Sequence, residues 1–492
     1  RDASLLPDRE RLAAGGELEL RADRVERQHR HLLGSVAGAS RHLLCVPRGD
    51  LRRSAERVPS RWVLDLAAEL AGSATSWWGH DLLDARTPWI RHVASFDAGL
   101  RHAPEPATPQ EHRLVSMLAA GGRLDRAGDA RTRSGVEVVL ARRSDAFTRF
   151  DGNVGGAGLA IPSPVGSLTS PTRLERWASC PLAYLVEDVL RASPVENPED
   201  ELEINALERG SLVHQILEDF LREVLARPEA ERPEPLEPWT AADHQRIEAL
   251  GRARCDEWEA RGLTGRPIFW RRDRRRILND LHDFLDRDST HRGGRHTSPV
   301  AAELGFGFDG EAPPVEVPLP DGQVLRFRGR ADRLDEATDG TLHVIDYKTG
   351  GFSQYRGLSE DDPVQGGTKL QLPVYGLAAR AHRGNAYTPV HAEYWFITTK
   401  GEFRHVGYDV TDDVLEQARS ALAAIVEGIE AGRFPAHPDT SATRGPWVGC
   451  DPCDPDGLGT VDLRRQWERK RHDPALAPYA QLVEPLDEEV PA

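Results

Sequence analysis

Two aspartates and a lysine lie in two apolar segments of the sequence, "GRADRLD" at residues 329–335 and "VIDYK" at residues 344–348. The segments have the pattern of adjacent strands joined by a short turn, so Asp332 and Asp346 can approach each other at neighbouring strand ends. Two carboxylates held together repel unless a cation neutralises them, and Mg²⁺ prefers oxygen ligands of this kind. Because residues two apart in a strand face the same side, Lys348 would lie beside Asp346, where it can orient or deprotonate a water. This set is suited to the hydrolysis of a phosphodiester; the alternative is a salt bridge at a strand end with no role in chemistry.

Two predicted helices on either side of these strands carry further candidates. The segment "ERGSLVHQILEDFLREVLARP" has the apolar stripe of an amphipathic helix, and His214 lies at the edge of that stripe. In the helix predicted for "KLQLPVYGLAARAH", Gln371 and Tyr375 are four residues apart and so share one face. Taken singly, such residues are more often packed side chains than parts of a site. Glu303, in the strand "AAELGFGF", is either an additional acid of the site or a salt-bridge partner.

The pattern of the chain changes from helices to strands between residues 299 and 348. Strands are predicted in "VAAELGFGF", "PVEVPLP", "QVLRFRGRADRLD" and "TLHVIDYK", with the turns "PDG" and "TDG" typical of hairpins. A further strand is predicted in "VHAEYWFITT", and a long helix from about residue 412 to 432. Ser170 followed by Pro171 is typical of a helix N-cap with proline at the first helical position, and it opens the segment "PTRLERWASCPLAYLVEDVL".

Length and composition indicate a multidomain globular protein. The 492 residues exceed an ordinary single core, and residues 151–170, rich in Gly, Pro and Ser, mark a boundary after a mostly helical, arginine-rich region. The net charge of −16 is unusual for a protein that binds nucleic acid, yet residues 271–276 and 462–472 are locally basic. Most such runs are solvated helix faces. The net charge therefore leaves DNA binding open.

Several features favour a cytoplasmic protein. No run of about 18 or more apolar residues is present, so we expect no membrane span, and the start of the chain lacks a signal-peptide pattern. Five cysteines are too few for a disulfide framework, which favours a reducing compartment. Since the chain begins with Arg1 and in mid-pattern, we expect it to be a fragment of a longer polypeptide.

Taken together, "GRADRLD", "VIDYKTG" and the downstream "QLPVY" resemble the motifs of the PD-(D/E)xK nuclease superfamily, more closely those of the RecB/AddB-type nuclease domain at the end of bacterial helicase–nuclease subunits. The resemblance covers residues 165–475, and "GSLVH", Gly210 to His214, matches the family's G-x-x-x-H. It implies an α/β fold with a restriction-endonuclease-like core, in which helices flank a mixed sheet. The ligands that it implies for Mg²⁺ or Mn²⁺ are His214, Asp332, Asp346 and the main-chain carbonyl of Tyr347. The catalytic residues that it implies are Asp332, Asp346, Lys348, Gln371 and Tyr375, the last two either supporting the site or contacting DNA.

The AddB-type domains also carry an iron–sulfur cluster held by one upstream cysteine and three near the C-terminus. Cys180, Cys450 and Cys453 match the first three positions, while the fourth falls near Gly459, where there is no cysteine. A [4Fe–4S] cluster normally uses four thiolates. The three cysteines therefore hold a cluster whose fourth ligand is missing or is an oxygen such as that of Asp454 or Asp456, hold zinc with a non-cysteine ligand, or are ordinary buried thiols.

The first part of the chain resembles the end of a helicase domain. The segment "VERQHRHLLGSVAGASRHLLCVPRGDLRR" is similar to the last motif of UvrD-like helicases, but residues 37–39, Ala-Gly-Ala, stand where active motors have a Thr-Arg-Ala step that contacts ATP. No G-x-x-x-x-G-K-[ST] occurs in the sequence. Residues 1–150 thus resemble a helicase domain with a decayed ATP site, as in AddB-type and actinobacterial AdnA-type subunits. The nuclease domain would follow at 165–475, and a tail at 476–492.

The resemblance implies a metal-dependent DNA nuclease, an exonuclease of a helicase–nuclease complex that processes double-strand breaks for recombinational repair. Its partners would be single-stranded DNA, duplex ends and a second motor subunit in a heterodimer. Two alternatives remain open: a module that grips DNA without cutting it, and a stand-alone Cas4-like exonuclease. The joint presence of Asp332, Asp346 and Lys348 disfavours a decayed site, and the helicase-like region disfavours a stand-alone enzyme.

Overall fold

The protein divides into two compact units, residues 1–128 and residues 129–492. The computed structural model describes residues 7–13, 15–50, 55–102, 105–119, 130–193, 202–437 and 461–483. The assignment of residues 1–150 to a helicase remnant and the boundaries at 165 and 475 stay predictions. No helix of the described residues is both long and apolar enough to cross a membrane.

The first unit consists of short helices and one small hairpin. Its helices are α1 (Asp8–Ala13), α2 (Arg21–Ala37), α3 (Arg61–Leu70), α4 (Gly79–Asp84), α5 (Phe96–Arg101) and α6 (Pro109–Ala119), and its hairpin pairs β1 (Gly49–Asp50) with β2 (Ala55–Glu56). Among the described residues of this unit, the buried apolar side chains are Leu64, Ala67, Ala68 and Leu100. So small a described core contributes little to stability by apolar burial.

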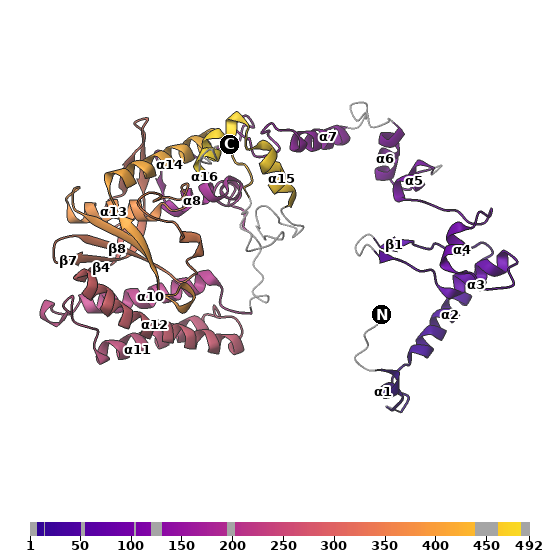
Figure 1. Ribbon diagram of the computed structural model, residues 1–492, viewed down its shortest axis with the longest axis horizontal. Helices are drawn as coiled ribbons and strands as arrows, with labels where there is room; N and C mark the ends of the chain where they lie inside the picture. Colours follow the sequence, from indigo (N-terminus) through magenta and orange to yellow (C-terminus); the bar gives the residue numbers. More distant parts are fainter. Residues whose placement is uncertain are drawn as a thin grey trace, which may run out of the picture. The chain divides into compact units, whose positions relative to one another are not determined.

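The second unit is built on a five-stranded mixed sheet (Figure 1). The strands in spatial order are β10 (His405–Asp409), β9 (Val390–Phe396), β8 (Leu342–Lys348), β7 (Gly329–Ala337) and β4 (Thr297–Phe306). All neighbours are antiparallel except β8 and β9, which are parallel and are connected through helix α13 (Gln371–Arg383). A smaller sheet has the order β3 (Leu168–Thr169), β6 (Val324–Phe327) and β5 (Val315–Pro318). The predicted α/β class with a mixed sheet is confirmed.

Helices cover both faces of the large sheet (Figure 1). One face carries α10 (Ala206–Leu225), α11 (Ala241–Ala260) and α12 (Pro267–Arg295). The other carries α8 (Pro171–Ser179), α13, α14 (Asp412–Glu430) and α16 (Ala477–Val483). The remaining described α-helices of this unit are α7 (Ala130–Arg143), α9 (Pro181–Tyr184), which continues into a π-helical turn at Leu185–Val189, and α15 (Val461–Lys470).

Because side chains alternate along β8, they contribute to two hydrophobic cores, one on each face of the large sheet. Ile345 and Tyr347 belong to the core under α10, α11 and α12, whereas Val344 belongs to the core under α13 and α14. Every residue from Leu342 to Tyr347 is buried, as expected for a central strand with both faces covered. Lys348, the last residue of β8, is only partly buried. Exposure to solvent therefore begins at the end of the strand.

Local signals in the sequence place the helices that flank the site. The side chain of Ser170 accepts a hydrogen bond from the Arg173 amide and Pro171 takes the first helical position, so the predicted cap of α8 is confirmed. The side chain of Asn205 caps α10 in the same way, accepting from the Glu208 amide. The predicted apolar stripe of α10 is buried.

The segment "QVLRFRGRADRLD" was predicted to be a single strand, and this was wrong. The structure divides it at Arg328, so that β6 belongs to the small sheet and β7 to the large one. The amide of Arg328 donates to the Thr169 carbonyl at 2.9 Å, which continues the small sheet. A side chain at Gly329 would meet the rings of Phe306 at 2.9 Å and Tyr375 at 3.1 Å, so glycine lets the chain pass between them into β7.

Candidate active site

The two predicted carboxylates lie on neighbouring strands. Arg333 pairs with Ile345 in the antiparallel β7–β8 ladder, so the same register carried one residue further sets Asp332 opposite Asp346. The amide of Tyr347 donates to Asp332 Oδ2 at 2.7 Å, which fixes the Asp332 side chain against the end of β8. Asp346 is buried, whereas the Asp332 side chain is 20% exposed, so the pair is reached from solvent on the Asp332 side.

His214 approaches the same carboxylate from helix α10. Its Nδ1 lies 2.9 Å from Asp332 Oδ1. One turn earlier, a side chain at Gly210 would come to 3.5 Å from Thr349 Oγ1, so α10 passes close to the end of β8 there. Burial lowers the pKa of His214, but the adjacent Asp332 carboxylate raises it more, and the net shift is upward. His214 and Asp332 thus form a polarised pair at the entrance of the site.

Lys348 lies on the other side of the carboxylates. Its Nζ forms an ion pair with Asp346 Oδ2, donates to Gln371 Oε1 at 3.0 Å and lies 4.9 Å from the centre of the Tyr394 ring. Burial lowers the pKa of Lys348, but Asp346 more than compensates, so the net shift is upward. Lys348 is therefore an ammonium ion at neutral pH in this arrangement.

Burial raises the pKa of the Asp346 carboxyl, and it does so against the opposing effect of Lys348. The like charge of Asp332 raises the pKa of Asp346 further. Both effects penalise the ionised carboxylate and both would be relieved by a cation placed between the two aspartates. The electrostatics of the pair are therefore those of a cation-binding site.

Gln371 and Tyr375 extend the contacts of Lys348 along α13. Gln371 Nε2 donates to the Tyr375 hydroxyl at 3.3 Å while its Oε1 accepts from Lys348. Tyr375 is buried and packs edge-on against Phe306. This favours the supporting role over DNA contact for Tyr375, because its hydroxyl already holds the glutamine that holds the lysine.

Sequence analysis missed one acidic residue beside this site, Glu175 of α8. Its Oε1 accepts hydrogen bonds from the amides of Leu370 at 2.5 Å and Gln371 at 3.1 Å, which are the first free amides of α13. Burial raises the pKa of Glu175, while the Leu370 amide and the charge of Lys348 lower it. The only sequence signal was indirect: α13 begins after Leu370, which has no side chain able to cap a helix.

Glu303, the other acid considered from sequence, lies in a salt-bridge network. It pairs with Arg222 at 3.0 Å and Arg330 at 3.2 Å. Glu218 of α10 lies against the same group, and burial together with the Glu303 carboxyl raises the pKa of Glu218 to about 7. Of the two roles considered for Glu303, the structure shows the salt bridge.

The cysteines predicted to hold a cluster fall partly beyond the described residues. Cys180 is buried where α8 meets α9. Cys450 and Cys453 lie outside the described residues. The iron–sulfur assignment therefore stays a prediction.

Several cations of the two basic runs are paired with neighbouring groups. In the first, Arg272 pairs with Asp273 at 2.9 Å and Arg274 with Asp256 at 2.6 Å. In the second, Lys470 is buried and donates to the Ala141 carbonyl at 2.7 Å, joining α15 to the end of α7. These contacts are structural, as solvated or anchoring charges commonly are.

The sequence of the chain is similar to those of known proteins. Residues 168–456 match the family model of the PD-(D/E)XK nuclease superfamily. Bacterial proteins named as subunits of an ATP-dependent helicase/deoxyribonuclease are similar to the chain. The one from Clostridium tetani is 28% identical over 213 residues, which is 42% of this chain and 17% of that protein. The one from Symbiobacterium thermophilum is 32% identical over 279 residues, 53% of this chain and 22% of that protein.

The chain thus spans about a fifth of the length of these relatives. A solved structure, that of SSO0001, is 18% identical to the chain and has a TM-score of 0.17. The match covers 44% of this chain and 87% of that one, and its TM-score is too low to bear on the fold.

Proposed function

Because the chain belongs to the PD-(D/E)XK nuclease superfamily, we propose that it hydrolyses phosphodiester bonds of DNA at the site formed by Asp332, Asp346 and Lys348. The observation that carries this proposal is the continuous set of contacts at one end of the sheet. His214 contacts Asp332, Asp346 pairs with Lys348, and Lys348 contacts Gln371. Residues from four elements, α10, β7, β8 and α13, thereby meet around two carboxylates that are costly to leave ionised side by side.

The donor set fits a hard divalent cation. We propose that Mg²⁺ or Mn²⁺ is held by Asp332 and Asp346, together with His214 and the main-chain carbonyl of Tyr347, because oxygen-rich sets suit these ions. The raised pKa of Asp346 supports this, since a nearby cation favours its ionised form. Such an ion supplies Lewis-acid polarisation of a phosphoryl oxygen and a more acidic bound water.

The protein's own groups then have separate roles. As an ammonium ion, Lys348 is suited to donate a hydrogen bond to the attacking water or to a phosphoryl oxygen rather than to abstract a proton. Gln371 and Tyr375 hold Lys348 in place. His214 restrains the more exposed carboxylate, Asp332. Rate would come from positioning and from charge placed where negative charge develops on the phosphate.

We further propose that the chain is part of a cytoplasmic helicase–nuclease subunit that acts as an exonuclease on double-strand breaks, with a motor subunit as partner. The names of the similar proteins support this, since they describe subunits of an ATP-dependent helicase/deoxyribonuclease. The substrates would be single-stranded DNA and duplex ends. An iron–sulfur or zinc site at Cys180, Cys450 and Cys453 remains part of this proposal.

The test is degradation of linear single- and double-stranded DNA with Mg²⁺, Mn²⁺ or EDTA, comparing the parent with Lys348→Ala. We expect metal-dependent cutting that falls by about 10²–10⁴-fold in the variant, the usual effect of removing one transition-state donor or acid–base group. Arg252→Ala is the matched control, because Arg252 is an exposed cation on α11 paired with Glu248. Equal cutting by parent and Lys348→Ala would contradict the assigned site. DNA binding by a folded parent without any cutting would favour a non-cutting module.

A further inference from the structure

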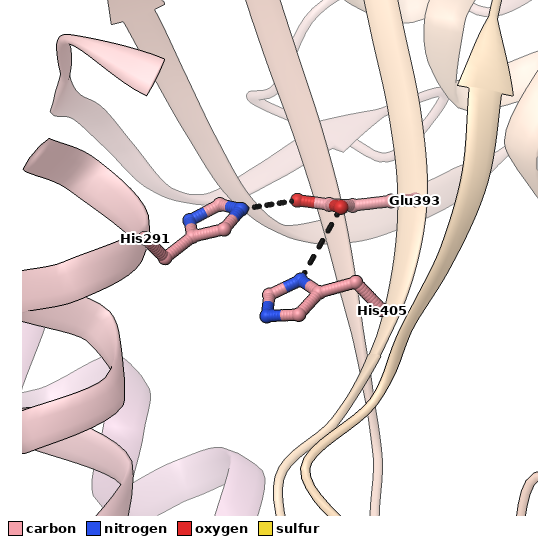
Figure 2. Close-up of side chains that lie close together, drawn as sticks. All are labelled: His291, Glu393 and His405. Carbon is pink, nitrogen blue, oxygen red and sulfur yellow. Dashed lines mark hydrogen bonds and ion pairs between the residues drawn. The ribbon is translucent and has the colours of Figure 1, made fainter. Parts of the chain in front are cut away.

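Two histidines and a glutamate meet on the sheet face opposite to Asp346. Glu393 in β9 lies beside Ile345 in the parallel ladder, whereas its neighbour Tyr394 lies beside Asp346. Since successive residues of a strand point to opposite faces, Glu393 points away from the proposed nuclease site, toward α12. His405 comes from the edge strand β10 and His291 from α12. The cluster therefore joins three elements (Figure 2). It lies on the opposite face of the sheet from Asp346 and is separate from the site described above.

The donor atoms of this triad are close enough to share one ion. His291 Nε2 lies 2.9 Å from Glu393 Oε1, and His405 Nδ1 lies 3.3 Å from Glu393 Oε2 (Figure 2). One ligand atom from each residue lies within 4.8 Å of the other two. Zinc bonds of about 2.0–2.1 Å in tetrahedral geometry separate two ligand atoms by roughly 3.3 Å. The triad is thus already near the size of a metal site.

Burial and hydrogen bonding make the triad costly without a further partner. Glu393 is 1% exposed and the His291 side chain 8% exposed. Among the described residues, Nδ1 of His291 has no hydrogen-bond partner. Nε2 of His291 meets Oε1 of Glu393 as an ion pair at 2.9 Å that lacks hydrogen-bond geometry. Buried polar atoms that lack a well-formed hydrogen bond carry a free-energy penalty.

The surroundings of the triad suit a ligand site that is fixed in shape. Oε2 of Glu393 lies 3.3 Å from Arg295, which orients the carboxylate as an outer partner does at metal sites. Trp395 packs at 4.9 Å from the His291 ring and 4.4 Å from the His405 ring, and the two imidazoles stack 4.4 Å apart. The His405 side chain is 29% exposed, so an ion has a way in and a water can reach the remaining position.

We propose that His291, Glu393 and His405 bind one Zn²⁺ ion that fastens α12 to β9 and β10. Two imidazoles and one carboxylate are a borderline-soft set that favours Zn²⁺ over Mg²⁺ or Ca²⁺. Because Glu393 faces away from Asp346, this ion takes no direct part in phosphodiester hydrolysis. It acts on the stability of the sheet edge.

The experiment measures bound zinc by mass spectrometry and thermal unfolding, on the full chain stripped with EDTA and re-loaded with one to three equivalents of Zn²⁺. His405→Ala is the main variant, because His405 is the most exposed ligand, and His405→Gln is a second variant that keeps a polar side chain of similar size. His282→Ala is the matched control, since His282 is an exposed histidine on the same helix as His291. Asp332→Asn separates zinc bound at the nuclease site.

We expect both His405 variants to lose one zinc equivalent and to lose the zinc-dependent rise in melting temperature. His282→Ala and Asp332→Asn should keep this zinc equivalent and this rise. Circular dichroism confirms that each variant is folded. An unchanged zinc equivalent and an unchanged zinc-dependent rise in the His405 variants would overturn the proposal. So would a folded parent that retains no zinc, or a zinc equivalent lost only in Asp332→Asn.

Discussion

Asp332 and Arg333 are neighbours in β7, yet they belong to two charged clusters of opposite character. The site cluster, defined as His214, Asp332, Asp346 and Lys348, opens to solvent at the end of the sheet. The buried ion cluster, defined as Asp288, Arg292, Arg333 and Asp335, is closed. Arg333 and Asp335 are both 0% exposed and pair at 2.6 Å. Neighbouring residues of one strand thus reach either a reactive or an inert environment, according to the face they point to.

The hydrogen bonds of the buried ion cluster are met by its own members and by neighbouring groups, and among the described residues none of its buried side-chain atoms lacks a partner. Arg333 also pairs with Asp288 at 2.6 Å, and Asp288 accepts from Trp239 Nε1 at 2.6 Å and pairs with Arg292 at 3.2 Å. Two arginines balance two aspartates. Direct partners outweigh burial in their effect on the pKa of Asp288 and of Arg333, whereas burial lowers the pKa of Arg292. The site cluster instead holds two carboxylates against one lysine and a histidine, with the side chains of Asp332 and Lys348 20–22% exposed. An incompletely neutralised, accessible pair of acids is what distinguishes a candidate site from a structural ion cluster.

The largest loss of stability should come from removing the central cation of the buried ion cluster. Arg333→Met leaves Asp288 and Asp335 buried without their main cation, and removing one partner of a buried pair typically costs about 3–5 kcal/mol. Denaturant unfolding of the second unit should show a loss of this size. The matched control is Arg330→Met in the same strand, whose side chain is 46% exposed and pairs with Glu303, and which should cost below about 1 kcal/mol. Equal losses in the two variants would mean that the clusters do not differ as described.

The sequence predicts a cluster only where its residues lie close together in the sequence. The strands that carry Asp332, Asp346 and Lys348 follow from apolar runs and turns, and two-residue spacing placed Asp346 and Lys348 together. Arg333 could not be told from any other polar strand residue, because its partner Asp288 is 45 residues away in helix α12. Glu175 was missed for the same reason, because the Leu370 amide that donates to it is 195 residues away in the sequence. Spacing within a segment is fixed by the backbone, whereas these pairs exist only once the fold has brought distant elements together.

A smaller effect is expected at the contact between α8 and α13, two helices on the same face of the large sheet. Glu175 caps the start of α13 and so positions Gln371, the partner of Lys348. We expect Glu175→Ala to reduce the turnover of DNA cutting by roughly 10-fold, about 1.4 kcal/mol of transition-state positioning, with little change in KM. Glu175→Gln keeps an acceptor oxygen for the amides and should recover most of the rate. Steady-state kinetics on a labelled linear duplex checks this, with Glu416→Ala on the exposed surface of α14 as control. A fall in both glutamate variants through KM alone would argue against a positioning role.

The smallest effect should appear in a third, half-open cluster, in which Glu218 and Glu303 share Arg222 and Glu303 also pairs with Arg330. The folded-state pKa of Glu218 is raised to about 7, above its ordinary value. The folded state therefore holds more protons than the unfolded state between these two values, so Glu218 reduces stability progressively as the pH rises through that window. Glu218→Gln should raise the melting temperature at pH 8 but not at pH 4. The gain in the free energy of unfolding should be below about 1 kcal/mol, because solvent screens the cluster.

Glu223, on the same helix, is the control with the opposite sign. Hydrogen bonding to Arg246 lowers the pKa of Glu223 despite partial burial, so Glu223→Gln should lower the melting temperature at pH 8 and lose that effect in acid. If Glu218→Gln lowered the melting temperature at pH 8, as Glu223→Gln is expected to do, the raised pKa of Glu218 would be refuted, and the half-open cluster would behave like the closed one.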